Sequence, residues 1–353
     1  MTGYHAVMRR LRSPAWRTGP PLVMVLLVAA PLLVAFSLLV TSLSPAHVPS
    51  SRPAKTHRGR PKVSSSDHLP PPGKVYVGVS EIGTSYAQFL KTAGLPRVAI
   101  ADVFTAPNED VHGILEHFAP TGPAAMISWD FPGNGTMASI ADGRYDSYIK
   151  RVAAEARKYA RPLFIRLDWE FNGHWYPWSA QTRSGQLRKG NSPSEYVAAW
   201  RHVVRLFGSA PNATFVWCPT LYHVVHSTRF QVSAWYPGNA YVGWIGLDSY
   251  LGSANWKYMQ FGPAALDADY AFAKAHHKPV MIAEWALSRP GPGDSPSLVS
   301  LFWNWMKSHP LVRAELWFNF DSSSAQHKLI DFPRSARELR GLLQQPSVLD
   351  RGP

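Results

Sequence analysis

Two glutamates stand where chemistry could be done, each at the end of a short apolar run and each among tryptophans. Glu170 lies in the segment RLDWEFNGHWYPW, and Glu284 lies in VMIAEW. Cleavage of a glycosidic bond uses two carboxyl groups, one protonated to assist the leaving oxygen and one ionised. Aromatic surroundings disfavour the charged form of a carboxyl and raise its pKa. We therefore predict Glu170 as general acid/base and Glu284 as nucleophile, with Tyr250 and Arg166 as candidate partners that keep Glu284 ionised.

Other polar residues near these glutamates have a structural interpretation beside the functional one. A lone glutamate at a strand end is commonly half of an ion pair, whereas two of them within tryptophan-rich segments favour catalysis. Asp168 shares its side-chain direction with Arg166 on an extended strand, so we expect these two to pair. Asp248 is expected to support the site by hydrogen bonding. Tryptophans inside the expected helices are expected to be core; they are Trp200, Trp303 and Trp305.

Short apolar runs that recur along the chain predict the elements that position the glutamates. Polar or aromatic residues follow each run, as expected for strands that end at a common site. The eight runs are 75–79, 97–103, 124–129, 163–167, 214–217, 244–247, 279–283 and 315–318. Helical periodicity lies between several of them, at 142–160, 191–207, 263–275 and 295–307, while the second and fifth intervals are less clearly helical. Ser192, Pro193 and Glu195 form a typical helix start.

Strands that alternate with helices indicate a parallel sheet, and eight units in residues 74–345 fit a (β/α)₈ TIM barrel. An open doubly wound sheet is the competing architecture, but the turn after the first run lacks its glycine-rich phosphate motif. In a barrel, catalytic groups lie at the carboxyl ends of the strands. The ends of the fourth and seventh strands lie across the barrel mouth, which brings Glu170 and Glu284 together.

The first 73 residues predict a membrane attachment that is separate from the barrel. Residues 1–20 are basic and are expected in the cytoplasm, and residues 21–41 are an uncharged apolar stretch. Such a length favours an uncleaved signal-anchor over a long cleaved signal peptide. Residues 42–73 are rich in Ser, Pro and basic residues and are expected to form a disordered linker. We expect the barrel to lie outside the cytoplasm, anchored or secreted, followed by a tail at 346–353.

Composition excludes several other classes of function. The net charge is +13, but residues 1–74 hold ten Lys and Arg and one acid, so the barrel region is nearly balanced. We therefore expect no nucleic-acid partner; a basic protein that binds nucleic acid or acidic polymer would depend on the N-terminal part alone. The single cysteine allows no intrachain disulfide, and neither a zinc-ligand spacing nor a Gly-x-Ser-x-Gly motif is present. We expect no metal, no cofactor and a monomeric catalytic domain.

Residues 162–178 (PLFIRLDWEFNGHWYPW) resemble the acid/base segment of glycoside hydrolase family 26, a clan A family of (β/α)₈ barrels. Residues 212–219, 235–250 and 278–285 resemble its next strand segments in the same order. The resemblance implies a retaining, endo-acting enzyme on β-linked polysaccharide, with Glu170 as acid/base and Glu284 as nucleophile. It also implies that aromatic, amide and basic side chains near the two glutamates bind the sugar. Together with the tryptophans at the strand ends, the predicted sugar-binding residues are Arg166, Trp169, Asn172, Trp175, Trp178, Trp217, Tyr250, Trp285 and Trp317.

The resemblance leaves the polysaccharide open. Family members are mostly endo-β-mannanases, with some mixed-linkage β-1,3-1,4-glucanases and β-1,3-xylanases. Well-known mannanases have histidine before the acid/base glutamate, where this chain has Trp169. We expect β-mannan first, then mixed-linkage β-glucan or an envelope exopolysaccharide. The alternative is a non-catalytic barrel of the cell envelope that binds polysaccharide without cutting it.

Overall fold

The computed structural model describes residues 68–353, apart from 81–84, 106–108, 119–121, 132–134, 222–230, 253–254, 262–264 and 323–324. Within this part, eight parallel strands pair in sequence order and the eighth pairs again with the first, so the sheet closes into a barrel. A short ninth strand adds to the edge of the first. The predicted (β/α)₈ architecture is therefore confirmed.

The strands begin close to where the apolar runs predicted them. They are β1 (Val75–Ser80), β2 (Ile100–Thr105), β3 (Ala124–Trp129), β4 (Leu163–Leu167), β5 (Ala213–Trp217), β6 (Trp244–Leu251), β7 (Val280–Leu287), β8 (Val312–Phe318) and β9 (Val348–Leu349). β6 and β7 each run four residues beyond the predicted end. Asp248 and Glu284 therefore lie within strands and not after them, because a carboxylate interrupts an apolar run without ending the hydrogen-bonded ladder.

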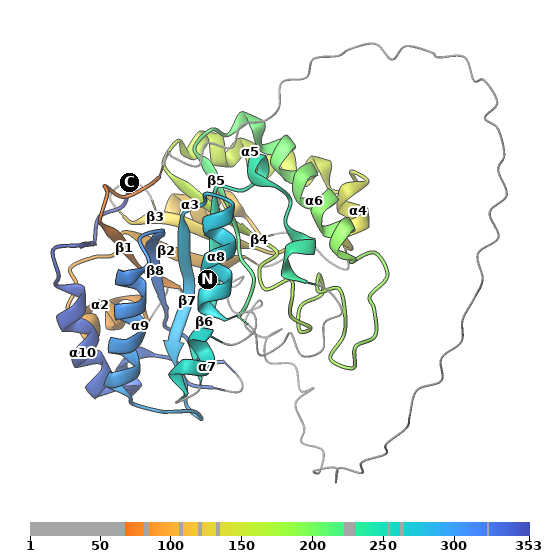
Figure 1. Ribbon diagram of the computed structural model, residues 1–353. Coiled ribbons are helices and arrows are strands. Elements are labelled where there is room, and N and C mark those ends of the chain that lie inside the picture. The colour runs from red at the N-terminus through yellow and green to blue at the C-terminus, as the bar shows by residue number, and fades with distance from the viewer. Residues whose placement is uncertain are drawn as a thin grey trace, which may run out of the picture. The chain divides into compact units, whose positions relative to one another are not determined.

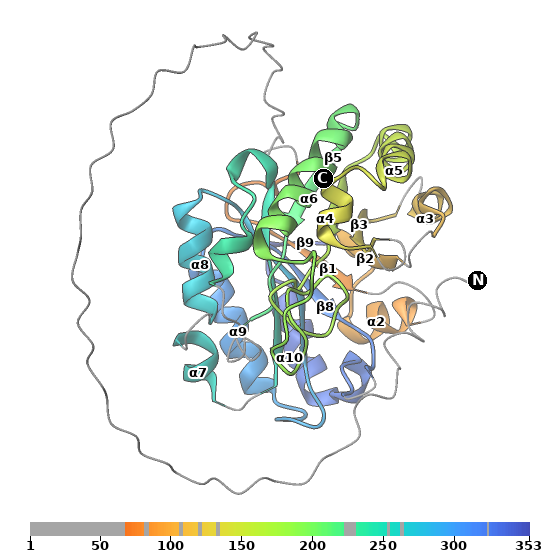
Figure 2. The ribbon, with the colours of Figure 1, turned by 90° about the vertical axis from the view of Figure 1, so that its right-hand side faces the viewer.

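Helices cover the outside of the barrel, with α2, α3 and α5 on one side of the strands and α7, α8 and α9 on the other (Figure 2). Their bounds are α2 (Tyr86–Ala93), α3 (Val111–Phe118), α4 (Met137–Ala141), α5 (Asp146–Tyr159), α6 (Pro193–Leu206), α7 (Trp256–Phe261), α8 (Leu266–Ala275), α9 (Pro296–Ser308) and α10 (Pro333–Leu343). α6 begins as predicted, since Ser192 and Glu195 exchange the two hydrogen bonds of a capping box and Pro193 is the first helical residue.

One helix prediction needs revision, and the two intervals described as less clearly helical differ from each other. The expected helix 142–160 begins later, because Asp142 caps the end of α4 and α5 starts only at Asp146. Between β5 and β6 the described residues form two 3₁₀ turns, η3 (Val232–Trp235) and η4 (Asn239–Tyr241), and no α-helix. The interval between β2 and β3 does contain a helix, α3.

The chain enters and leaves the barrel at the amino ends of the strands. His68 Nε2 contacts the Asn212 carbonyl at 2.8 Å, just before β5. Arg313, near the start of β8, donates to the carbonyls of Pro70 and Pro71. β9 pairs in parallel with the start of β1. The last residues of the predicted linker and most of the predicted tail are therefore part of the folded barrel.

Residues 1–67, which include the predicted anchor 21–41, lie outside the described residues. None of the helices that the structure describes has the length and apolar content needed to cross a bilayer.

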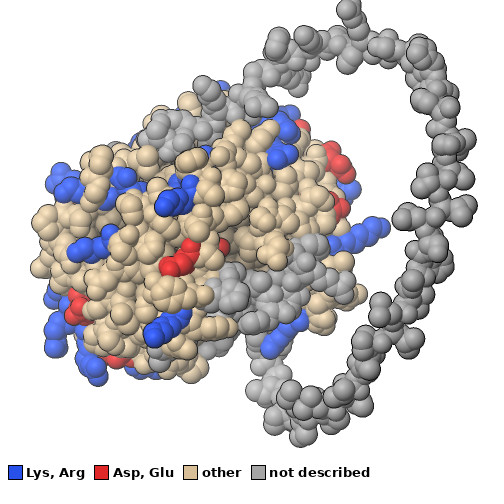
Figure 3. Space-filling view, in the orientation of Figure 1, with Lys and Arg blue, Asp and Glu red and all other residues tan. Residues whose placement is uncertain are grey.

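On the face shown in Figure 3, Lys and Arg side chains are dispersed and form no continuous stripe. Figure 1 shows the carboxyl ends of β6 and β7 converging beside α7, at the end of the barrel that holds the candidate site.

Candidate active site

The backbone directly after β4 is irregular, and this segment carries Glu170. Asp168 and Glu170 both have a positive φ, 40° and 50°, a conformation that costs a residue with a side chain about 1 to 3 kcal/mol. Two backbone hydrogen bonds hold it. The Asp168 N–H donates to the Trp129 carbonyl at 3.1 Å, and the Glu170 N–H donates to the Cys218 carbonyl at 2.8 Å. The segment is therefore fixed to β3 on one side and to the end of β5 on the other.

Glu170 is buried and its pKa is raised to about 7, first by burial and then by the negative charge of Glu284. Arg166 and two hydrogen bonds act in the opposite direction. The Trp175 indole donates to Glu170 Oε2 at 2.7 Å, and the Thr220 hydroxyl donates a further bond. A carboxyl with this pKa holds its proton in mildly acidic solution and can give it to a leaving group, as general acid catalysis requires.

Glu284 lies on β7 and has both of the partners expected for it. Its Oε1 lies 2.6 Å from Nη1 of Arg166, and its Oε2 accepts a hydrogen bond from the Tyr250 hydroxyl. Each oxygen of this carboxyl therefore has its own polar partner, a guanidinium for one and a hydroxyl for the other. The two glutamates are thus treated differently by their surroundings, one held towards the neutral form and the other paired with a cation.

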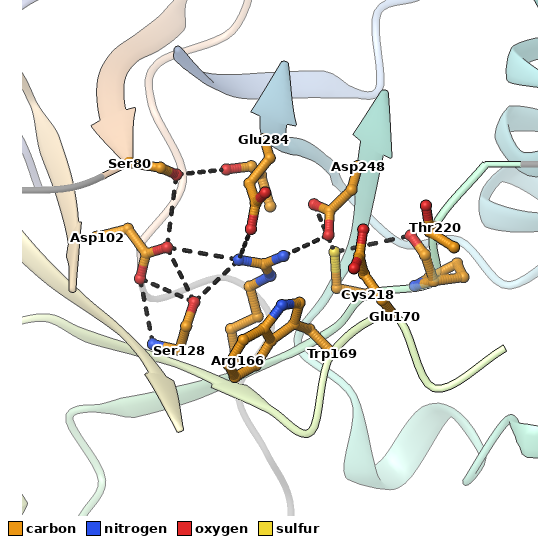
Figure 4. Close-up of polar contacts among 12 residues, drawn as sticks. Ser80, Asp102, Ser128, Arg166, Trp169, Glu170, Cys218, Thr220, Asp248 and Glu284 are labelled. Atoms are coloured by element: carbon orange, nitrogen blue, oxygen red, sulfur yellow. Dashed lines mark hydrogen bonds and ion pairs between the residues drawn. The ribbon is translucent and has the colours of Figure 1, made fainter. Parts of the chain in front are cut away.

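Arg166 is the centre of a buried ion-pair network (Figure 4). Besides Glu284, it contacts Asp102 Oδ2 at 3.4 Å and Asp248 Oδ2 more closely. Ser128 connects the network further, because its hydroxyl lies 2.9 Å from Arg166 Nη1 and 2.9 Å from Asp102 Oδ2. One guanidinium thereby faces three carboxylates on three other strands, and the group is closed off from solvent.

Two expectations for Arg166 are corrected by this network. Arg166 does not pair with Asp168, whose Oδ1 has no hydrogen-bond partner among the described residues. The strand ends at Leu167, so the alternation of side chains no longer holds at Asp168. Arg166 was also expected to bind sugar, but its side chain is completely buried beneath the carboxylates. Its role in the structure is to position Glu284 and Asp248.

An irregularity in the pairing of β6 and β7 brings two carboxylates side by side. Leu247 pairs with Ile282, whereas the next residue, Asp248, pairs with Glu284, so Ala283 is an additional residue on β7. Bulges of this kind redirect side chains beside active sites. Here the extra residue places Glu284 level with Asp248, and both contact Arg166. The hydrogen-bonding support expected of Asp248 thus takes the form of an ion pair.

The aromatic side chains that follow Glu170 differ in their exposure. Trp175 is 36% exposed beside Glu170. Trp169 and Trp178 are buried. The Trp169 indole donates to the Tyr176 hydroxyl, and the Trp178 indole donates to the Trp169 carbonyl at 2.7 Å. Trp178 also stacks on Tyr176 with ring centroids 4.3 Å apart, so this pair supports the wall of the site.

Three predicted sugar-binding tryptophans are not brought to the mouth. Trp217 packs against Phe272 of α8, and Trp285 packs against Phe302 of α9, between the barrel and its helices. Trp317 lies against Trp285 and donates to the His327 carbonyl. All three are buried. Trp285 follows Glu284 directly on one strand, and successive strand residues point to opposite faces, so it faces outward.

Asn172, another predicted sugar-binding residue, instead joins two loops. Its side-chain amide donates to the Thr220 carbonyl at 2.8 Å and accepts from the Thr220 N–H at 2.9 Å. Because Thr220 hydrogen-bonds Glu170, this pair of bonds fixes the loop after β5 against Glu170. Tyr250, by contrast, is half-buried next to Glu284, where a ligand could reach it.

Several residues of the site carry no signal that separates them from core residues in the sequence. Asp102 lies inside the apolar run of β2, and Ser128 lies inside that of β3. Cys218, the lone thiol, donates to Asp248 Oδ1 at 3.2 Å. A charged residue within a buried strand is an indication that it has a partner, which could have marked Asp102. Among the described residues no group of three or more His, Cys, Asp or Glu is placed to hold a metal ion.

Comparison with known proteins agrees with this geometry. Residues 136–269 match the model of glycosyl hydrolase family 26. Endoglucanase H of Acetivibrio thermocellus is 30% identical over 207 residues, 56% of this chain and 22% of that protein. A beta-1,3-xylanase of a Vibrio species is 27% identical over 159 residues, 43% of this chain and 29% of that protein. The chain thus spans less than a third of the length of either relative.

Solved structures share the fold at lower identity. A modular endo-beta-1,4-mannanase from Cellulomonas fimi superposes with a TM-score of 0.57 at 19% identity, over 79% of this chain and 72% of that one. The Bacillus subtilis mannanase BCman superposes with a TM-score of 0.56 at 17% identity, over 82% and 90%. Residues 136–269 are thus similar to glycosyl hydrolase family 26, and the solved mannanases share the barrel fold.

Proposed function

We propose that the protein is a retaining, endo-acting glycoside hydrolase that cleaves β-linked polysaccharide. The observation that carries the proposal is the difference between its two central glutamates. Glu170 is buried with a pKa raised to about 7, while Glu284 is paired with Arg166 and Tyr250. Glycoside hydrolysis requires this division between a proton donor and an ionised carboxylate.

In the proposed reaction Glu170 protonates the oxygen of the leaving sugar while Glu284 attacks the anomeric carbon and forms a glycosyl ester. Glu170, now ionised, then takes a proton from water, and the water oxygen displaces Glu284. Arg166 and the Tyr250 hydroxyl stabilise the Glu284 carboxylate before attack and after release. The exposed face of Trp175 is placed to stack on a sugar ring beside Glu170.

We propose β-mannan as the first substrate to test, followed by mixed-linkage β-glucan, β-1,3-xylan and an envelope exopolysaccharide. The activities named for the relatives support this range, since they include an endoglucanase, a beta-1,3-xylanase and mannanases. Trp169 does not present its ring to a ligand, because it is buried and its indole is bonded to Tyr176. Sugar choice therefore rests on exposed groups such as Trp175 and Tyr250.

The test is a reducing-sugar assay of the full chain on these polymers and on cellulose, beside Glu170→Gln and Glu284→Gln. Release of oligosaccharides from one polymer, lost with Glu284→Gln and reduced about 10²- to 10⁴-fold with Glu170→Gln, is expected. Retention of configuration is checked by ¹H NMR of the first anomer released. Folded protein that binds a polymer and releases nothing would instead identify a non-catalytic polysaccharide-binding barrel.

We also propose that the barrel works outside the cytoplasm, attached through the apolar residues 21–41 or released after their removal. The support is the sequence pattern of basic residues followed by an uncharged stretch. If the barrel is anchored, protease added to intact cells should degrade it. If it is released, it should be detected in the culture medium. Protection of the barrel until the cells are lysed would contradict the proposal.

A further inference from the structure

A cavity lies between α9 and the amino ends of β1 and β8, at the opposite end of the barrel from Glu170 and Glu284. Its volume is about 190 Å³, room for roughly six water molecules at about 30 Å³ each. The inner wall is formed by Trp303, Met306, Val312 and Glu315, which are all buried. The rim is formed by more exposed residues, among them three cationic side chains. The cavity therefore has a largely apolar interior and a charged opening.

The inner wall holds two polar atoms with unused hydrogen-bonding capacity. Glu315 Oε2 accepts from the Trp285 indole, but its Oε1 has no partner among the described residues. The indole N–H of Trp303 also lacks one. Burial raises the pKa of Glu315 to about 8, and the carboxyl plays no part in the proposed hydrolysis. A buried polar group without a partner lacks the hydrogen bonds that water would give it, so both atoms favour an occupant that can bond them.

The rim offers positive charge that is not neutralised. Lys74, Lys307 and Arg313 line the opening, and the described residues contain no ion pair between any of them and a carboxylate. Lys74 donates to the Pro346 carbonyl, and Arg313 donates to three backbone carbonyls through Nε and Nη2. Lys307 is exposed on α9. Three cations around one opening favour an anionic group there.

We propose that this cavity binds a small amphipathic carboxylate that carries a hydroxyl at the end remote from its carboxylate, as in a hydroxy-substituted aromatic acid. Its ring lies against Trp303 and Met306, and its carboxylate lies at the opening beside Lys307. Its hydroxyl accepts from the Trp303 indole and pairs with Glu315 Oε1, accepting from the neutral carboxyl or donating to the ionised one, since a hydroxyl can do both. This occupant uses the apolar wall, the two unpartnered atoms and the cationic rim together.

The test is calorimetric titration of the full chain with 4-hydroxybenzoate, benzoate and 4-hydroxybenzyl alcohol. Benzoate lacks the hydroxyl and is expected to bind roughly fivefold to a hundredfold more weakly, the effect of two net hydrogen bonds. The alcohol lacks the charge and is expected to bind more weakly still, without the salt dependence of the acids. Equal binding of the three compounds would overturn the roles given to the hydroxyl and the charge. No binding at millimolar concentration would overturn the proposal as a whole and leave a cavity that holds water only.

Substitutions separate this cavity from the sugar site, where an aromatic compound could also stack. Trp303→Phe should reduce the advantage of 4-hydroxybenzoate over benzoate to about threefold to tenfold, because it removes one of the two partners of the hydroxyl and leaves Glu315. Lys307→Glu should weaken both acids about fivefold, whereas Lys158→Glu, the same charge change on the exposed surface of α5, should not. Because Lys307 is on the surface, its substitution is expected to leave folding and polysaccharide hydrolysis intact. Binding that is insensitive to Trp303 and Lys307 would place the ligand elsewhere and refute the site.

Discussion

The hydrogen bond between Trp175 and Glu170 sets the pH range in which the acid/base keeps its proton. Trp175→Phe keeps an aromatic ring but removes the indole N–H that lies 2.7 Å from Glu170 Oε2. This bond stabilises the ionised carboxyl, so its loss should raise the pKa of Glu170. A hydrogen bond to a charged group contributes about 1.5 to 3 kcal/mol, and the lower value applies because Trp175 is partly exposed and water can replace it. One pKa unit corresponds to about 1.4 kcal/mol, so a rise of about one unit is expected.

Two assays measure this shift. NMR titration of ¹³C-labelled glutamate carboxyls reports the pKa of Glu170 without a substrate, starting from about 7 in the unchanged protein. With a substrate in hand, the alkaline limb of kcat/KM reports the same group in the free enzyme. At pH 8 the unchanged enzyme should retain about a tenth of its maximal kcat/KM and the variant about half of its own maximum.

The matched control is Trp178→Phe, since the Trp178 indole donates to the Trp169 carbonyl and not to Glu170. The alkaline limb of kcat/KM of Trp178→Phe should lie at the same pH as that of the unchanged protein. If Trp175→Phe left the titration of Glu170 in place or moved it to lower pH, the reasoning that ties this pKa to the indole would be refuted.

Three further predictions concern stability, measured as the free energy of unfolding in urea. Arg166→Met should cost about 3 to 5 kcal/mol, because it leaves buried carboxylates without their cation; a loss below 1 kcal/mol would contradict the network. Gly246→Ala should lower the free energy of unfolding by about 1 to 3 kcal/mol, since the new Cβ would stand 2.7 Å from Cys218 Sγ. The control Gly341→Ala in α10 meets no neighbouring atom and should raise that free energy by about 0.5 to 1 kcal/mol. Equal effects of the two substitutions would contradict the packing described. The folded pKa of Glu315, about 8, exceeds its ordinary 4.5, so between these values the folded protein binds more protons and loses stability as pH rises. Glu315→Gln should flatten that slope by up to about 1.4 kcal/mol per pH unit, and an unchanged slope would show that the carboxyl titrates normally.

Local patterns predicted the elements well because their causes are local. The apolar runs match the buried strands, and the Ser192 start of α6 depends only on residues within one helical turn. The pairing of Glu284 with Arg166 and Tyr250 was also predictable, since an ionised carboxylate in a barrel mouth needs such partners. Alternation along a strand also requires Trp285 to face away from Glu284, which is why it does not reach the site with that residue.

The remaining features depend on contacts between strands that are distant in sequence. Asp102 is 64 residues from Arg166, and nothing near it indicates that pairing. The additional residue Ala283 in β7 aligns Asp248 with Glu284 only through the register of two strands. The positive φ of Asp168 is imposed by hydrogen bonds to neighbouring strands, which ended the alternation on which its expected ion pair was based.

The attachment of residues 68–74 to the amino ends of the strands has a consequence for the orientation of the enzyme. His68, Pro70 and Pro71 are held there by Asn212 and Arg313, at the opposite end of the strands from Glu170 and Glu284. Anything joined to the chain before His68, such as an affinity tag or a solid support, therefore connects at the end with the amino termini of the strands. A tag or support joined there is therefore expected to leave the other end of the barrel, where Glu170 and Glu284 lie, accessible to long polymer chains.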